Sequence, residues 1–522
     1  MNSFVQKHQS QVIGVLSGFD RLMVRGMIRQ VGYAEGMQRF LNARGILLKD
    51  FGEYAEATSN QVKQASVAVA ERAGRPVQYL ASPRVRKDEL AREIAKRDAI
   101  DDGLICVFKT IEPLHGFALN RNRETKQLEL RMEPRKGLYL YHYYQHPVFG
   151  FLHVRLQTWL PFQVQVWLNG REWLARTLDR KRIAYERRDN CFSWIANVER
   201  AQRLMDEQLA IRWPFALDLL RARAHPAHEK VFAPWPFDYY WSVYQSEWAT
   251  DVMFHDQRSL AELYQRLVQH GITRFQCRDV LRFLGKKPPV HGGIHGNFIG
   301  EVTSDIKYRP EGVRLKHYVD GNSVKIYDKH GTVLRAETTI NNPSGFKVYR
   351  TAEGDDAGQP GWRPMRKGIA DLTRRTEVSQ AINDRYLDAL ASCEDTAPLG
   401  ELTANLCRPV TWNGRRARAL HPWSPHDLGL LRAVGRAELL VNGFRNADLC
   451  HALHGAPPKD DTVRRRRAAA ITRSIRLLRA HGCVHKRPKS HRYMVSPKGH
   501  RIISALLAAY QANTESLSKL AA

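Results

Sequence analysis

Residues suited to phosphate chemistry alternate along residues 312–340. The Asp-Gly pair at 320–321 is a strong signal for a two-residue hairpin, and pairing through that turn places Lys316 opposite Lys325. Residues 329–331 (Lys-His-Gly) can close a second hairpin with a left-handed glycine, which adds a third strand. Because side chains alternate along a strand, one face of this sheet is predicted to be polar. That face carries Arg314, Lys316, Lys325, Tyr327, Arg335 and Glu337.

The predicted polar face is dominated by positive charge. Lys316, Lys325 and Arg335 stand in line across neighbouring strands, where like charges repel. A phosphodiester backbone would remove that repulsion. The sequence therefore predicts a phosphate clamp of Arg314, Lys316, Lys325 and Arg335. Glu337 is the only carboxylate on this face, and it could hold a divalent metal such as Mg²⁺ or Mn²⁺ beside the clamp.

The segment NSVKIYDK at 322–329, followed by LRAE at 334–337, resembles the strand pair of plasmid rolling-circle replication initiators. Such proteins nick one DNA strand through a tyrosine, assisted by a metal that acidic residues hold. The resemblance implies that Glu337 is the metal ligand and that Tyr386, in a helix expected over 375–391, is the nucleophile. The chain departs from that pattern because no second acidic ligand is evident nearby. Tyr386 also lies on the apolar stripe of its helix, which favours a buried core tyrosine.

Other acidic residues offer alternatives to this site. Asp20 is expected at the head of a strand, where it either binds a metal in a nuclease-like sheet or caps a turn. Glu247 and Asp251 are four residues apart and would share the face of a helix, either as a metal site or as ordinary surface. Convergence of these acids with Glu337 or Asp328, near a tyrosine, would indicate catalysis.

A second concentration of charge lies at residues 462–501, which hold thirteen Lys or Arg and no Asp or Glu. Residues 464–480 contain neither Pro nor Gly, and Ile471, Ile475 and Leu478 recur at helical spacing. The pattern predicts a helix with an apolar back and a cationic front, ending at His-Gly. A strand, a basic turn, a returning strand and a further helix are expected after it.

This order of elements resembles a winged helix-turn-helix domain over residues 436–512, with a preceding helix at 445–453. In such domains a helix reads bases in the major groove and the cations of the wing hold phosphates. A solvated helix face with a loop is the alternative. The predicted DNA-binding residues are Arg464, Arg465, Arg466, Arg473, Arg476, Arg479, Lys486, Arg487, Lys489 and Arg492.

Composition agrees with a nucleic-acid partner. The 522 residues carry a net charge of +28, with a pI near 10.0, and such a field attracts polyanions. No run approaches the roughly 18 apolar residues of a membrane span, and no secretory signal is evident, so no membrane association is expected. Seven cysteines are scattered without a Cys-x-x-Cys pair, which predicts a reducing, cytoplasmic setting.

The expected fold class is α+β and multidomain. It begins with a mixed α/β part at 1–115, and antiparallel strands with an aromatic-rich helical region follow at 116–290. A basic-faced β-meander at 291–350, a linker with helices at 351–435 and the winged helix domain at 436–522 complete it. Within the second segment Tyr139, Tyr141 and Tyr143 share one strand face. They either stack on bases or line a core.

These features predict a DNA-binding protein of a mobile genetic element, with a strand-nicking activity of the replication-initiator or transposase type. A non-enzymatic DNA- or RNA-binding protein and a winged-helix transcriptional regulator are the alternatives. Duplex DNA is the expected partner, and the oligomeric state is not predicted. The whole chain also resembles an uncharacterised multicopy bacterial family, which implies no mechanism.

Overall fold

A computed structural model describes residues 3–286, 302–310, 312–351, 358–391, 399–436, 439, 443–458, 460–487 and 490–511. The chain forms two compact units that are interleaved in sequence. The first unit contains residues 1–12, 255–331 and 381–522, and the second contains 13–254 and 332–380. Both hold helices and strands, so the expected mixed α and β composition is confirmed.

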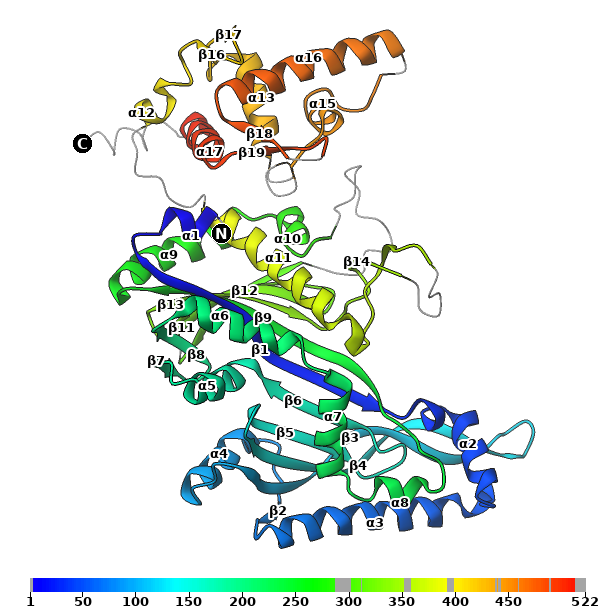
Figure 1. Cartoon of the computed structure of the whole chain (residues 1–522). Coiled ribbons are helices and arrows are strands. Elements are labelled where there is room, and N and C mark those ends of the chain that lie inside the picture. The colour runs from blue at the N-terminus through cyan, green and yellow to red at the C-terminus, as the bar shows by residue number, and fades with distance from the viewer. Residues whose placement is uncertain are drawn as a thin grey trace. The chain divides into compact units, whose positions relative to one another are not determined.

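The second unit is built on a large mixed sheet with the strand order β13-β9-β1-β6-β5-β4-β3-β2 (Figure 1). The pairs β13–β9, β1–β6, β6–β5, β5–β4 and β4–β3 are antiparallel, and β3–β2 is parallel. The bounds of these strands are β1 Val12–Met27, β2 Val77–Tyr79, β3 Gly103–Arg121, β4 Leu128–His146, β5 Gly150–Gln157, β6 Val164–Asn169, β9 Tyr240–Phe254 and β13 Val333–Ile340.

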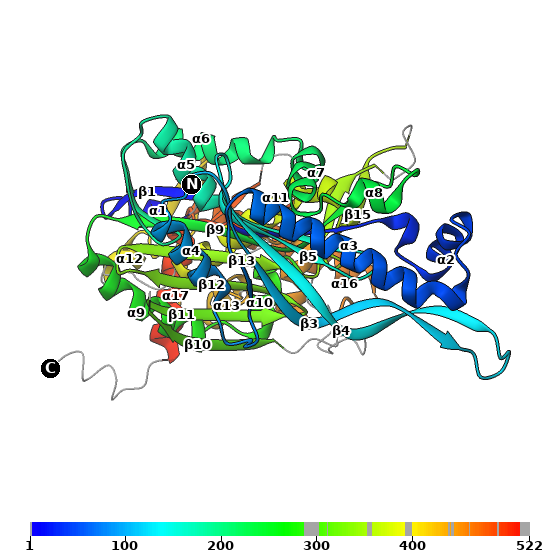
Figure 2. The same cartoon turned by 90° about the horizontal axis from the view of Figure 1, so that it is seen from below.

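Two of these strands are longer than the sequence predicts. The Ser-Gly pair at 17–18 predicts a break within residues 11–28, but β1 runs unbroken through it. The residues Pro-Arg-Lys at 134–136 predict a turn between strands at 127–132 and 137–144, but β4 is continuous there. The turn instead lies at 122–127, where the Asn122 side chain accepts hydrogen bonds from the Glu124 and Thr125 amides. Side-chain capping of this kind fixes the reversal. The β3–β4 ribbon that results projects beyond the neighbouring strands of its unit (Figure 2).

Helices pack against this sheet. They are α2 Ala34–Ala43, α3 Phe51–Arg72, α4 Lys87–Arg97, α5 Gly170–Arg180, α6 Val198–Asp206, α7 Trp213–Ala224 and α8 His228–Phe232. The sequence predicts a helix over residues 161–179, with a proline in its first turn. The first part of this prediction is wrong, because β6 occupies Val164–Asn169. Strand β6 pairs with β1 on one side and with β5 on the other. Asn169 then caps α5 by accepting from the Arg171 and Glu172 amides.

The second unit also holds two small hairpins, β7 Tyr185–Arg188 with β8 Cys191–Ile195, and β14 Lys347–Arg350 with β15 Gly361–Pro364. The row of three tyrosines on β4 belongs to the core rather than to a surface. Tyr139, Tyr141 and Tyr143 are buried, and the hydroxyls of Tyr141 and Tyr143 donate to Glu112 and Asp88. The core alternative is therefore confirmed, and these rings are not free to stack on bases.

The first unit contains three antiparallel strands, β10 Thr303–Arg309, β11 Gly312–Val319 and β12 Asn322–Lys329, with helices α9 Gln257–Thr273 and α10 Cys277–Phe283. The predicted register of the 320–321 hairpin is confirmed, because Lys316 pairs with Lys325 and Leu315 with Ile326. Both turn residues have positive φ, as a type I′ turn requires. Helix α11 (Leu372–Leu390) has residues in both units.

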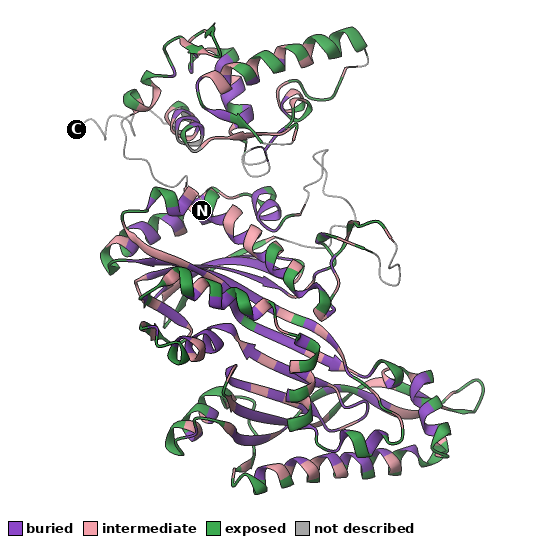
Figure 3. Ribbon diagram, in the orientation of Figure 1, coloured by how far each residue is buried: buried purple, intermediate pink, exposed green. Residues whose placement is uncertain are grey.

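The C-terminal part of the first unit is helical with short strands. It holds α12 Leu399–Ala404, β16 Val410–Trp412, β17 Arg415–Ala417, α13 Pro425–Val434, α15 Asn446–His454, α16 Asp461–Ala480, β18 Val484–Lys486, β19 Tyr493–Val495 and α17 Pro497–Gln511. Ile471, Ile475 and Leu478 of α16 are buried in its core, as their spacing predicts. The first turns of α16 are exposed (Figure 3). No helix among the described residues combines the length and hydropathy of a membrane span.

Three histidines, His142, His225 and His228, are buried in the second unit. Burial lowers the pKa of His142 to about 4. Burial, together with the neighbouring His228 and Arg221, lowers the pKa of His225 well below its usual range. The folded protein therefore keeps these rings neutral at pH values where the unfolded chain would protonate them.

Acid should destabilise the fold through these rings. Above about pH 6.5 both states of His142 are neutral, whereas between pH 6.5 and about 4 only the unfolded state gains a proton. The linkage predicts a loss of about 3 kcal/mol from His142 over that interval. His142→Phe should flatten the fall in melting temperature between pH 7 and pH 4.5, whereas His115→Phe, at an exposed position, should leave it unchanged. Equal slopes for the two variants would contradict this account.

Candidate functional site

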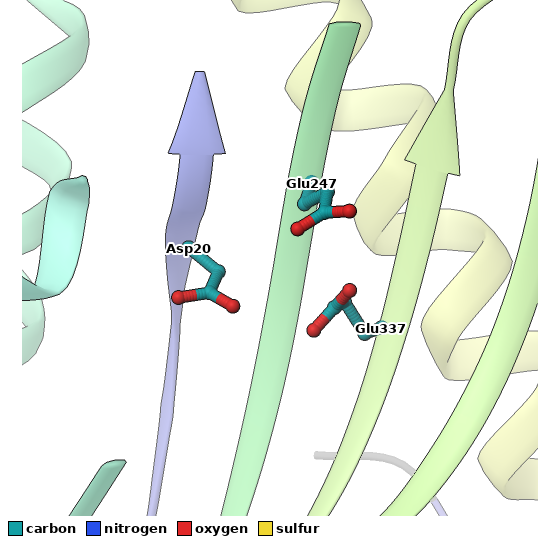
Figure 4. A group of neighbouring side chains, drawn as sticks. All are labelled: Asp20, Glu247 and Glu337. Atoms are coloured by element: carbon teal, nitrogen blue, oxygen red, sulfur yellow. The ribbon is translucent and has the colours of Figure 1, made fainter. Parts of the chain in front are cut away.

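Three carboxylates converge on one point of the sheet in the second unit. Asp20 comes from β1, Glu247 from β9 and Glu337 from β13, which are consecutive strands in the sheet order. One oxygen from each lies within 4.8 Å of the others, so the three carboxylates could hold one metal ion. Figure 4 shows the three side chains pointing toward a common space between their strands.

Strand register explains how Glu247 and Glu337 meet. Glu337 pairs with Ala249, and Thr339 pairs with Glu247. The two glutamates are therefore diagonal neighbours on one face of the β9–β13 pair, within reach of each other's side chains. Asp20 reaches the same space from β1, on the other side of β9.

A buried ion-pair network lies beside the triad, on the same face of the β9–β13 pair. Arg335 is fully buried, and it binds Asp251 through Nε to Oδ1 at 2.6 Å and Nη2 to Oδ2 at 2.9 Å. Its Nη1 donates to Asp20 Oδ2 at 3.1 Å. The Arg171 guanidinium, also buried, lies 2.9 Å from Asp251 Oδ2. Two arginines and two aspartates thus link β13, β9, β1 and α5.

Asp20 and Arg335 favour each other's charged form. Burial by itself would raise the pKa of Asp20, but Arg335, Arg171 and Arg21 outweigh burial and lower it. Burial would lower the pKa of Arg335, but Asp251 and Asp20 outweigh burial and raise it well above its usual range. Asp20 is therefore a carboxylate at neutral pH, which is the form that ligates a metal.

Asn190 fixes the orientation of the Asp20 carboxylate. It sits at the turn between β7 and β8, and its Nδ2 lies 2.6 Å and 2.8 Å from the two Asp20 oxygens. Its backbone oxygen accepts from Arg335 Nη2 at 2.7 Å. The tip of the β7–β8 hairpin is thus hydrogen-bonded both to the Asp20 carboxylate of the triad and to Arg335.

Arg21 is the solvent-facing cation of the site. Its Nε lies 3.9 Å from Glu247 Oε2, and its side chain is 51% exposed. Burial of its polar atoms lowers its pKa, but Glu247, Asp20 and Glu337 outweigh that effect and raise it. Arg21 therefore stays charged beside the triad while remaining open to an incoming anion.

Part of the carboxylate triad was predicted from the sequence. Glu337 is at the predicted metal position, and Asp20 and Glu247 are two of the acids considered as its partners. Asp20 lies within β1, so the turn-capping alternative is wrong. Glu247 and Asp251 share a face of a strand, not a helix, and Asp251 is bound by the two buried arginines. Asp328 belongs to the first unit.

The predicted phosphate clamp is not assembled as expected. Arg335 is buried, and its donors go to Asp251, Asp20 and Asn190, so it serves the triad rather than a phosphate. Arg335 also belongs to the second unit, whereas Arg314, Lys316 and Lys325 belong to the first.

The other three predicted clamp cations lie in the first unit, where Arg314 and Lys325 are buried and Lys316 is partly exposed. Arg314 is largely buried and is bound at 2.8 Å by Asp305 of β10, a strand that the sequence did not predict. Burial and the neighbouring Lys325 and Arg314 lower the pKa of Lys316, which agrees with the predicted repulsion between these cations.

Tyr386 lies in the core of the first unit. Its side chain is fully buried, and its hydroxyl is 2.9 Å from His317 Nε2. The rings of Phe275 and Phe283 pack against it. Burial raises its pKa well above the usual range, which disfavours the phenolate that attacks phosphorus. Its position on the apolar stripe thus has the simpler explanation of core packing.

The predicted DNA-binding residues form a cationic surface on α16 and the β18–β19 region. Arg479 is half-buried, with its guanidinium 4.9 Å from the ring of Trp412 and 5.9 Å from that of Tyr493. Arg492 donates to the Gly443 carbonyl at 3.1 Å. Lys489 lies outside the described residues. The exposed members are Arg464, Arg465, Arg466, Arg473, Arg476, Lys486 and Arg487.

Removing Arg335 should destabilise the protein strongly. Arg335→Met leaves Asp251 and Asp20 buried without their main partner, which typically costs about 3–5 kcal/mol. Urea-induced unfolding would measure the effect. Arg72→Met, on the exposed surface of α3, is the matched control and should change stability by less than about 0.5 kcal/mol. Equal midpoints for both variants would show that the network is not a structural support.

Carboxylates from three strands form the ligand set that Mg²⁺ and Mn²⁺ prefer. Such a site can orient a phosphate and activate a water or hydroxyl for attack on it. No protein-family model, curated protein or solved structure matches this chain. The chemistry of the site itself is therefore the basis for assigning a function.

Proposed function

We propose that this protein is a metal-dependent DNA strand-cleaving or strand-transferring enzyme of a mobile genetic element. The observation that carries the proposal is the convergence of Asp20, Glu247 and Glu337 from three consecutive strands. The second support is the arginine-rich surface of α16, which suits the phosphates of duplex DNA.

The triad residues are assigned as the metal ligands. Asp20, Glu247 and Glu337 would hold Mg²⁺ or Mn²⁺, which supplies Lewis-acid stabilisation of the charge on the phosphoryl oxygens. Arg21 would contact a nonbridging oxygen of the same phosphate, because it is charged and half exposed beside Glu247. Arg335 and Asn190 are positioning residues that fix the Asp20 carboxylate.

The proposed nucleophile is a water molecule or the terminal hydroxyl of a DNA strand. The attacking oxygen gives its proton to solvent and forms a bond to phosphorus while the bond from phosphorus to the leaving oxygen breaks. The leaving oxygen then takes a proton from solvent. Tyr386, which the initiator resemblance implied, has no part in this proposal because it is buried against His317. No covalent protein–DNA intermediate is then required.

Target recognition is assigned to the C-terminal elements. The order α13, α15, α16, β18, β19, α17 resembles that of a winged helix-turn-helix domain, and in the proposal α16 would enter the major groove. Asn446 bonds the Ala468 carbonyl and the Thr472 hydroxyl, each at 2.9 Å, so α15 and α16 are held as a pair. Lys486 and Arg487 would contact phosphates beside the groove.

A non-enzymatic DNA-binding protein is the second candidate. The exposed arginines of α16 favour it, because they need no metal site to bind DNA. The two candidates differ in whether the triad binds a metal and whether bound DNA is cut.

Metal binding and cleavage should depend on the triad. Isothermal titration of the full chain with Mn²⁺ should show a site that Glu247→Gln and Glu337→Gln weaken at least about tenfold, since each removes a charged ligand. Both variants should lose nicking of supercoiled plasmid. Glu262→Gln, an exposed glutamate of α9, is the control and should retain both properties.

Tyr386→Phe should also retain cleavage, with no protein left joined to a DNA end. A covalent adduct that disappears in Tyr386→Phe would contradict the proposed nucleophile. DNA binding without any metal site or cutting would leave the non-enzymatic candidate.

Duplex binding should depend on α16. Replacing Arg473 and Arg476 by Ala should weaken affinity and lower the slope of log affinity against log salt by about 1.8, since each phosphate contact contributes about 0.9. Fluorescence anisotropy with a labelled duplex would measure the slope. The control variant replaces Arg72 and Arg84, which are exposed in the second unit. If the α16 variant keeps the wild-type slope, α16 does not contact the duplex.

A further inference from the structure

We infer that the β16–β17 hairpin is a second phosphate-binding element, which extends the DNA-contacting surface of α16 along the backbone of the same duplex. The inference rests on the proposed function, because it assumes that α16 binds duplex DNA. It adds residues 408–416, which lie outside the helix and the wing.

Turn chemistry builds the hairpin. Asn413 and Gly414 both have positive φ, at 49° and 70°, which is the conformation of a type I′ turn. Trp412 then pairs with Arg415, and Thr411 with Arg416. This tight reversal presents both arginines beside the tip, and both are exposed.

The hairpin lies in a segment with only positive formal charge. No Asp or Glu occurs between Glu401 and Asp427, whereas the same segment contains Arg408, Arg415, Arg416 and Arg418. Arg418 is committed to structure, since its Nη1 and Nη2 bind the two Asp427 oxygens, each at 2.7 Å. Within the described part of the chain, Arg408, Arg415 and Arg416 form no ion pair, and all three are exposed.

Specific contacts hold the hairpin against α16. The Arg479 guanidinium lies 4.9 Å from the Trp412 ring and 5.9 Å from the Tyr493 ring, so one arginine joins the hairpin, the helix and β19. After the hairpin, the Arg418 carbonyl accepts from His481 Nε2 at 2.8 Å, just beyond the end of α16. The hairpin is thus fixed beside the C-terminal end of the helix, as Figure 1 shows.

The length of α16 explains why a second phosphate-binding element, the β16–β17 hairpin, could contact the same duplex. At 1.5 Å per residue, Arg464 and Arg479 are about 22 Å apart along α16, which is longer than the major groove is wide, about 12 Å. A helix that enters the groove by its N-terminal turns therefore carries its C-terminal end out to the phosphates at the edge. Arg415 and Arg416 stand at that end.

Duplex DNA is the occupant that these observations favour. The major groove of B-form DNA admits a helix, whereas the major groove of A-form RNA is too narrow. The tip of the hairpin carries two arginines, and Asn413 is its only amide side chain. Cations of this kind suit phosphate contacts rather than the reading of bases. Its contribution should be independent of DNA sequence.

The test is salt-dependent binding of the full chain to a labelled duplex of about three helical turns, roughly 30 base pairs. Replacing Arg415 and Arg416 by Ala should weaken binding roughly tenfold or more at 0.1 M salt and lower the slope by about 1.8. Replacing the same two residues by Lys keeps the charge and should keep most of the slope, which separates phosphate contact from misfolding. The Arg72 and Arg84 double alanine variant is the matched control and should behave like wild type.

Three results would overturn the inference. If the Arg473 and Arg476 variant loses slope while the Arg415 and Arg416 variant keeps it, the hairpin does not touch DNA and the proposed reading by α16 survives. If the Arg415 and Arg416 variant lost affinity only for duplex RNA, the hairpin would be assigned to RNA instead of duplex DNA. If the wild-type chain binds duplex DNA without salt dependence, the proposed DNA recognition fails together with the inference.

Discussion

The buried ion pair between Arg335 and Asp251 is the interaction on which the candidate site depends. It joins β13 to β9 at paired positions, because Arg335 and Asp251 are direct partners in the strand register. Its remaining donor reaches Asp20 on β1. One guanidinium therefore aligns the three strands that carry the triad. A charge so deeply buried is stable only because the opposite charges and the hydrogen bonds around it are complete.

The arginines of this protein fall into a buried group and an exposed group. Arg171, Arg335 and Arg375 are buried and bind carboxylates or backbone oxygens. Arg375 donates to Ser246 and to the Val243 and Ile340 carbonyls, and burial lowers its pKa to about 9. The arginines of α16 and of the β16–β17 hairpin, by contrast, are mostly exposed. Net charge alone does not distinguish these two populations, because it counts a buried arginine and an exposed arginine equally.

The two proposed activities are placed in different parts of the chain. The triad lies entirely in the second unit, and the arginine-rich helix lies in the first. Recognition and chemistry would then have separate structural requirements. Site recognition depends on exposed charge with a long-range field, whereas the triad depends on fixed distances within a rigid sheet.

Sequence alone determined the features that short-range physics controls. The register around residues 320–321 followed from an Asp-Gly turn, and the buried side of α16 followed from the spacing of Ile471, Ile475 and Leu478. Turn geometry and helical period act over a few residues, so they can be read locally.

Tertiary structure decided which acids meet and which arginine is buried. Glu337 was found from its strand face, but its meeting with Asp20 and Glu247 depends on the order β13-β9-β1, which no local pattern encodes. For the same reason Arg335 was expected to face a phosphate, although Asp251 from a distant segment neutralises it. Burial and Coulomb attraction depend on which strands become neighbours, and long-range pairing sets that choice.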